Sequence, residues 1–102
     1  MSVKSQLNST REVLMAGLRA SARVPRHNSQ TEQIIQACLD MVETMARRPA
    51  EVAVNEVEIT LSVMNKAVSE LDDDTTTTKA VVSSMQNAIG RLQGVRAELG
   101  AR

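Results

Sequence analysis

Apolar residues recur at alternating intervals of three and four along the second half of the chain, and this spacing constrains the fold more than any other feature. Over 54–71 the series is Val54, Val57, Leu61, Met64, Val68 and Leu71, and over 81–99 it is Val81, Met85, Ala88, Leu92, Val95 and Leu99, widened by Val82 and Ile89. Such spacing places the side chains on one face of an α-helix and is that of a coiled-coil seam. It predicts two amphipathic helices. One follows Pro49, which is acceptable as its first residue, and carries its apolar stripe over 54–71, and the other covers about 77–99.

Two further helical patterns precede these. Residues 2–22 place apolar side chains on one side, and this helix should end before Pro25, because proline disfavours helical backbone at the preceding residue. The second pattern starts at Ser29, which with Glu32 has the form of a capping box, and ends in the cations Arg47 and Arg48. The apolar residues on one side of 2–22 are Val3, Leu7, Leu14 and Leu18.

These patterns predict an all-α fold, a small antiparallel bundle within a single domain of residues 1–102. It has four amphipathic helices, or three if Pro49 only kinks the second and third into one. The chain has no Phe, Tyr or Trp, so Val, Leu, Ile, Met and Ala must fill a slim core. The methionines on the inner stripes, which we expect to fill the core, are Met41, Met45, Met64 and Met85.

Small residues in the first and fourth helices predict close helix packing. One surface of this kind comprises Ala16, Gly17, Ala20 and Ser21. Gly90 and Gly94 form a second, where glycine costs helix propensity but permits a near approach.

Charge is unevenly distributed although the chain is neutral overall. Residues 1–28 carry net +4, residues 29–75 net −7 and residues 76–102 net +3. The basic outer helices can therefore lie beside the acidic central ones. The composition of residues 1–30 also fits an organellar transit peptide, as an alternative to a helix of the domain. We expect a cytoplasmic protein with no membrane span, because charges interrupt every apolar run and the lone Cys38 suits a reducing compartment.

Residues suited to catalysis or metal binding are few. The only histidine, His27, lies in a predicted linker, and Cys38 lies where the apolar stripes of its helix meet. The acidic run Asp72–Asp74 lacks the spaced ligands and the glycine of a calcium loop and suits the capping of the following helix. The sequence predicts no enzyme, no catalytic residue, no metal and no cofactor.

One stretch offers an alternative. Residues 49–53, PAEVA, followed by 59–71, ITLSVMNKAVSEL, resemble the helix-turn-helix of bacterial winged-helix repressors over about a fifth of the chain. The resemblance implies a DNA-binding regulator with a recognition helix that carries Thr60, Ser62, Asn65 and Lys66. The stretch departs from the family pattern at Glu58, which stands where the turn glycine is expected, and it is acidic where DNA requires cations.

The leading expectation is a non-enzymatic helical interaction or assembly protein, such as a subunit, scaffold, adaptor or small chaperone. A protein partner fits best, either another helix or a second copy in a homodimer. Nucleic acid is disfavoured, because no aromatic side chain can stack on bases. The expected interaction seam comprises Val54, Val57, Ile59, Leu61, Met64, Val68, Leu71, Val81, Val82, Met85, Ile89 and Leu92. Val52, Ile59 and Val63 lie off the main stripe of the third helix, so some apolar surface should remain once the bundle closes.

Overall fold

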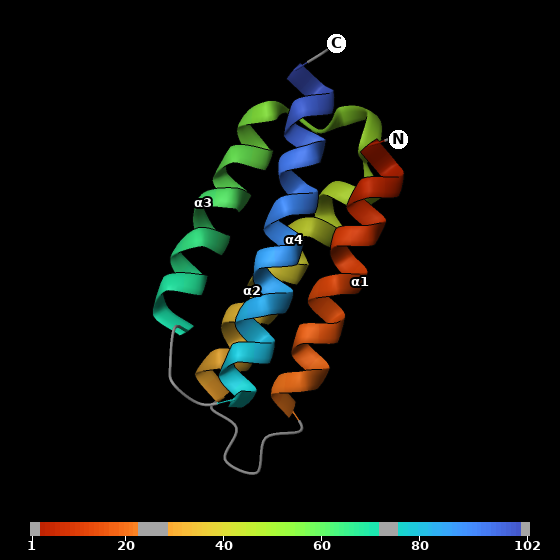
Figure 1. Ribbon diagram of the computed structural model, residues 1–102. Coiled ribbons are helices and arrows are strands. Elements are labelled where there is room, and N and C mark those ends of the chain that lie inside the picture. Colours follow the sequence, from red (N-terminus) through yellow and green to blue (C-terminus); the bar gives the residue numbers. More distant parts are fainter. Residues whose placement is uncertain (1–2, 23–28, 72–75, 101–102) are drawn as a thin grey trace.

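Four α-helices make up most of the molecule, and they confirm the expected all-α bundle. The computed structural model describes residues 3–22, 29–71 and 76–100, and that part of the chain contains no strand. The elements are α1 (Val3–Ala22), α2 (Ser29–Arg47), the short 3₁₀ turn η1 (Pro49–Glu51), α3 (Val54–Leu71) and α4 (Thr76–Gly100). Figure 1 shows the helices side by side with their axes roughly aligned.

Pro49 separates α2 from α3, so the four-helix alternative is the correct one. Arg48 leaves helical geometry with φ −133° and ψ 55°, and Pro49 opens the 3₁₀ turn, where a missing N–H costs nothing. Val52 is extended, with φ −67° and ψ 126°. The backbone groups of the turn remain paired, because Arg48 N–H donates to Met45 O over 3.0 Å and Glu51 N–H donates to Arg48 O over 2.9 Å.

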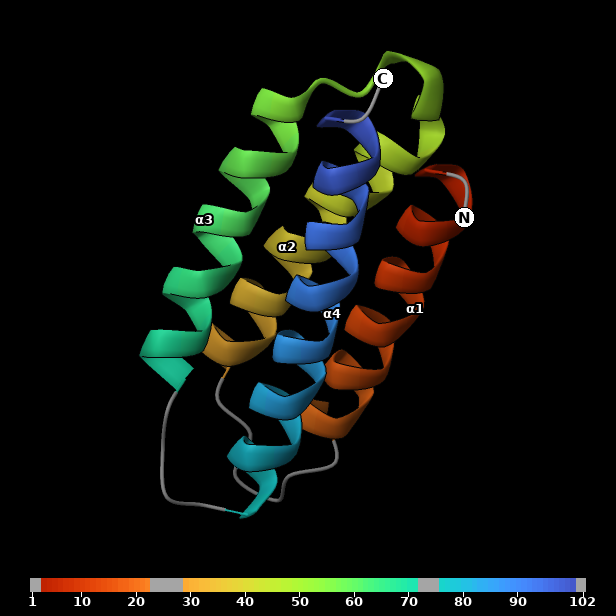
Figure 2. The same cartoon turned by 45° about the horizontal axis from the view of Figure 1, so that its top comes forward.

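Each helix runs antiparallel to its two neighbours around a square. α1 packs most extensively on α4 and next on α2, α3 packs mainly on α4, and the edge between α2 and α3 is the least extensive. α1 and α3 lie diagonally opposite, as do α2 and α4. Figures 1 and 2 show the start of α1 and the end of α4 at the same end of the bundle, and α3 along one side.

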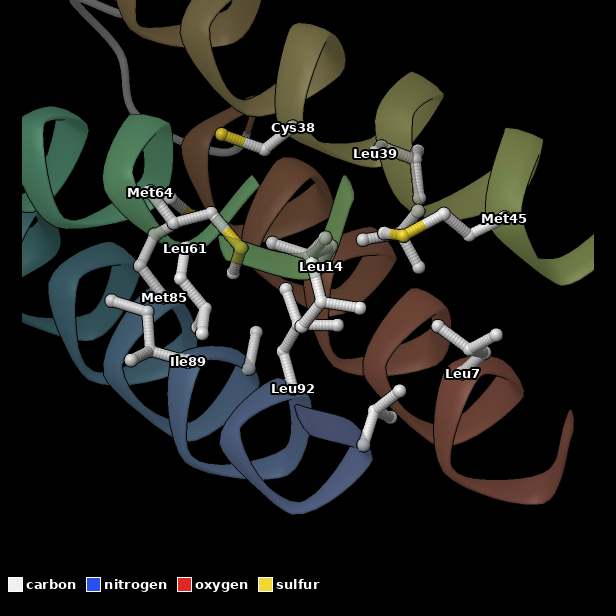
Figure 3. Packing of buried hydrophobic residues seen from close by; sticks show 14 of the residues in the cluster. Leu7, Leu14, Cys38, Leu39, Met45, Leu61, Met64, Met85, Ile89 and Leu92 are labelled. Carbon is white, nitrogen blue, oxygen red and sulfur yellow. The ribbon is translucent and has the colours of Figure 1, made fainter. Parts of the chain in front are cut away.

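The core consists of aliphatic and sulfur-containing side chains from all four helices. Leu14 of α1 and Leu92 of α4 extend toward each other in its middle, with Met64 and Met85 close by (Figure 3). The methionines behave as expected at three positions, where Met45, Met64 and Met85 are buried, whereas Met41 is half-buried. Flexible thioethers thus fill space that aromatic rings occupy in other cores.

The buried face of α1 is the predicted one, with one polar residue set into it. Val3, Leu7 and Leu14 are buried and Leu18 is partly buried. Thr10 is also fully buried, and its hydroxyl donates to Gln6 O over 2.8 Å. This bond within the helix lets a threonine occupy a core position without leaving its donor unpaired.

Two glycines hold α1 and α4 close together, and a third does not. A Cβ at Gly17 would lie 3.1 Å from Ser84 Cβ, and one at Gly94 would lie 3.2 Å from Gln6 Nε2. At Gly90, however, a Cβ would meet nothing within 4 Å, and Ala16 is exposed. The prediction of close packing is therefore confirmed at Gly17, where the neighbour is a Cβ, whereas at Gly94 the neighbour is the end of the flexible Gln6 side chain. The prediction is wrong at Gly90, beside which there is open space.

Ion pairs join the basic outer helices to the acidic central ones. Arg11 of α1 lies 3.6 Å from Glu43 of α2, and Arg96 of α4 lies 2.7 Å from Glu58 of α3. The Arg11–Glu43 pair is half-buried and the Arg96–Glu58 pair is exposed. Accessible pairs of this kind contribute about 0–1 kcal/mol each, so these contacts favour the pairing of helices more than they stabilise the fold. None of the described helices combines the length and apolar character needed to cross a membrane.

Candidate interaction surface

Most of the expected interaction seam faces the inside of the bundle. Ten of its members are buried or packed against the core, and the side chain of Leu71 lies outside the described residues. A partner cannot reach the buried members while the bundle is closed. Among the described members only Ile59 is exposed, at 51%. The ten inward members are Val54, Val57, Leu61, Met64, Val68, Val81, Val82, Met85, Ile89 and Leu92.

An apolar pair lies on the outward side of α3. Ile59 and Val63, exposed to 51% and 38%, are the large hydrophobic residues that stay accessible in the described part of the chain. They are four apart on one helix and therefore adjacent on its surface. The expectation that apolar residues off the main stripe stay accessible is confirmed at Ile59 and Val63. It is wrong at Val52, which is buried.

Charged residues extend this pair into a stripe, which we name the outer seam: Glu56, Ile59, Val63, Lys66 and Glu70. Its members are separated by three, four, three and four residues, so they share one face of α3. Lys66 and Glu70 are exposed, and Glu56 is half-buried. The outer seam therefore has an apolar middle with a carboxylate before it and a cation after it.

Glu56 is held at the start of α3. Arg48 Nη2 donates to Glu56 Oε2 over 3.2 Å, and Ala53 N–H donates to Glu56 Oε1 over 3.5 Å. Arg48 also lies 3.7 Å from Glu51. The group contains two carboxylates and one cation, so its net charge is negative. Within the described part of the chain, Lys66 at the other side of the apolar pair makes no ion pair.

The helix-turn-helix implied by the resemblance is absent from this segment. Glu58, at the position of the expected turn, lies inside the continuous helix α3, and only three residues form η1 before it. Thr60 is 2% exposed, and its hydroxyl donates to Glu56 O over 2.8 Å. Ser62, Asn65 and Lys66 are exposed. The implied recognition residues therefore do not share one accessible face.

The thiol of Cys38 is enclosed in the core. The residue is fully buried, and loss of solvation raises the pKa of the thiol from 9.0 to about 11, against a smaller lowering by a backbone hydrogen bond. The thiol is therefore protonated at neutral pH, which is the inert form. His27 and Asp72–Asp74 lie outside the described residues. Elsewhere in the described chain, no three His, Cys, Asp or Glu side chains come together in a way that suits a metal ion.

The raised pKa of Cys38 predicts a loss of stability at alkaline pH. Well below pH 9 the thiol is neutral in both states, so it makes no difference to unfolding. Between pH 9 and about 11 the unfolded chain ionises first, and the free energy of unfolding should fall by on the order of 2 kcal/mol. Urea titrations followed by circular dichroism measure this. Cys38→Ala should lack this component, and parallel pH curves for the two proteins would contradict it.

A hollow on the exposed side of α1 is another surface feature of the described chain. Its lining comes from a single helix, and Arg91 of α4 donates to the hydroxyl of Ser9 at its edge. The residues are Lys4, Ser5, Asn8, Ser9 and Glu12. Side chains of one helix cannot enclose a ligand, so the outer seam is the stronger candidate site. No protein-family model, curated protein or solved structure matches the chain.

Proposed function

We propose that the protein is a non-enzymatic helical interaction or assembly module that binds a protein partner through the outer seam of α3. The observation that carries the proposal is the exposure of Ile59 beside Val63. Single exposed apolar residues are ordinary, but here two adjacent ones occupy the middle of a stripe framed by charges. A partner that covers them removes apolar surface from water, which is favourable by roughly 25 cal/mol per Å².

The charges of the outer seam support a specific contact. Oppositely charged groups at fixed positions choose a partner and its register, whereas the apolar middle supplies attraction. Subunits, scaffolds, adaptors and small chaperones all bind through helix faces in this way. We also propose that the protein is not an enzyme, and the burial of its single thiol, which is protonated, supports this. A buried free thiol also suits the reducing cytoplasm, which we propose as the location.

Capture experiments with a matched pair of variants test the proposal. The protein is immobilised, its partners are captured from cells of its source, and they are identified by mass spectrometry. A variant carrying Ile59→Glu and Val63→Glu should reduce capture at least about tenfold, because two carboxylates would be desolvated in the contact. The control carries Gln86→Glu and Gln93→Glu, which add the same charge at exposed positions of α4.

Circular dichroism melting curves must show that both variants remain folded. Capture should be unchanged in the control. A folded Ile59→Glu, Val63→Glu variant that captures the same partners as the wild type would remove the outer seam as the binding surface.

A further inference from the structure

The charges of the outer seam are arranged so that the seam complements itself. Its apolar middle, Ile59 and Val63, is flanked three residues before by Glu56 and three residues after by Lys66. We propose that the partner of this surface is a second copy of the chain, and that the two α3 helices pack antiparallel about a two-fold axis. This inference rests on the proposed function and specifies its partner.

The pairing follows from the spacing along α3. With the two-fold axis midway between Ile59 and Val63, each Ile59 meets the partner's Val63, and this contact occurs twice. The same register places Glu56 opposite the partner's Lys66, also twice. Antiparallel coiled coils pair seam positions in this manner, and oppositely charged pairs select orientation and register.

The parallel arrangement is unfavourable for the same residues. It would place Glu56 against the partner's Glu56 and Lys66 against the partner's Lys66. Like charges at facing positions repel, and Glu70 would add a third repulsive pair. The sequence of charges therefore distinguishes the two orientations, although the apolar residues alone do not.

The existing contacts at the start of α3 favour the antiparallel pair further. Arg48, Glu51 and Glu56 form a group with two carboxylates and one cation. The partner's Lys66 would supply the missing cation and neutralise the group. Its aliphatic stem could lie along the apolar middle while its ammonium reaches Glu56.

The contact is small, so the dimer should be weak. Two half-exposed aliphatic residues per copy bury far less area than the roughly 1,200 Å² of stable interfaces. We expect a dissociation constant on the order of 100 μM, with association stronger at low salt. The full chain is therefore studied by sedimentation equilibrium up to about 1 mM. Interference optics are suitable, because the protein has no Tyr or Trp to absorb in the near ultraviolet.

Charge reversal tests both the partner and the orientation. In the antiparallel dimer Lys66→Glu replaces two attractions by two repulsions, so the dissociation constant should rise at least about tenfold. Adding Glu56→Lys to the same chain restores both attractions and should return association to near the wild-type level. In a parallel pair, by contrast, Lys66→Glu only exchanges one repulsion for another. Lys79→Glu, the same charge change on an exposed residue of α4, is the control and should have no effect.

Folding is checked by melting curves, because Glu56 also contacts Arg48 and Ala53. If Glu56→Lys unfolds the chain, Glu56→Gln takes its place. The variant with Lys66→Glu and Glu56→Gln should then associate better than Lys66→Glu alone, since one charge of each repulsive pair is gone.

Several results would overturn the inference. They are a wild type that stays monomeric at the highest concentration, an unchanged dissociation constant for Lys66→Glu, and a folded rescue variant that does not recover. A monomeric wild type whose capture of a different protein is lost with Ile59→Glu and Val63→Glu would overturn the second copy as partner and leave the proposed function standing. Loss of self-association with Lys66→Glu and its recovery in the rescue variant would support both the second copy as partner and the proposed function.

Discussion

Leu14→Ala is expected to lower the free energy of unfolding by roughly 2–5 kcal/mol. Leu14 is completely buried on α1 and extends toward Leu92 of α4 in the middle of the core (Figure 3). Truncation removes apolar contacts from both helices and leaves a cavity. No aromatic side chain is available to move into it. The measurement is chemical denaturation followed by far-ultraviolet circular dichroism, comparing the transition midpoints at equal slope.

Ile59→Ala provides the matched control, because it also shortens a branched aliphatic side chain. Ile59 is 51% exposed, so its removal should cost less than about 1 kcal/mol. A larger loss of stability for Leu14→Ala than for Ile59→Ala would show that Leu14 lies in the core and Ile59 outside it. Equal losses at Leu14 and Ile59 would contradict the arrangement of the helices described above.

Gly17→Leu is expected to destabilise the protein by roughly 1–3 kcal/mol. Even a single added carbon would lie 3.1 Å from Ser84 Cβ, and this atom is attached to the backbone of α4. Rotation of a side chain cannot relieve such a contact. Leucine has a higher helix propensity than glycine by somewhat under 1 kcal/mol, which offsets only part of the clash. Thermal and chemical unfolding of the variant measure the net effect.

Gly90→Leu tests the same substitution without the clash. A Cβ there meets nothing within 4 Å, and the position is exposed on α4. Only the gain in helix propensity remains, so this variant should be more stable than the wild type by about 0.5–1 kcal/mol. Stabilisation by both substitutions would show that Gly17 does not lie against Ser84.

The helices could be predicted well because their pattern is local. Periodicity predicts a third helix with its stripe over 54–71, and α3 spans Val54–Leu71, although Pro49 opens the turn η1 and is not the first residue of that helix. Periodicity also predicts a helix over about 77–99, and α4 spans Thr76–Gly100. The break at Pro49 could not be decided from sequence, because proline is compatible with both a kink and a reversal. The backbone of Arg48, which leaves helical geometry, determines the reversal.

The candidate surface could be predicted less well from the sequence than the helices. A spacing of three and four shows which residues share a helix face, but it does not show whether that face meets the same chain or another. The inner stripe of α3, which includes Val57, Leu61 and Met64, is therefore easy to recognise and proves to be core. The outer seam has the same spacing, but Glu56 and Lys66 occupy positions where apolar residues would reveal it.

The resemblance to a helix-turn-helix misleads for a related reason. Side-chain similarity over 59–71 says that the segment is helical, and this is confirmed by α3. The turn depends on the backbone near Glu58, where the family pattern has glycine. With glutamate there, the helix continues without interruption.

The most extensive helix pair joins the two segments that are farthest apart along the chain, α1 and α4. During synthesis α1 leaves the ribosome long before α4. Its apolar side chains therefore cannot pack against α4 until most of the chain has been translated. At about 5–20 residues per second this interval lasts several seconds. The hairpin of α1 and α2 can form meanwhile, but it leaves the face meant for α4 uncovered. Nascent chains of this protein therefore expose Leu7 and Leu14 to chaperones for longer than a bundle held mainly by sequential neighbours would.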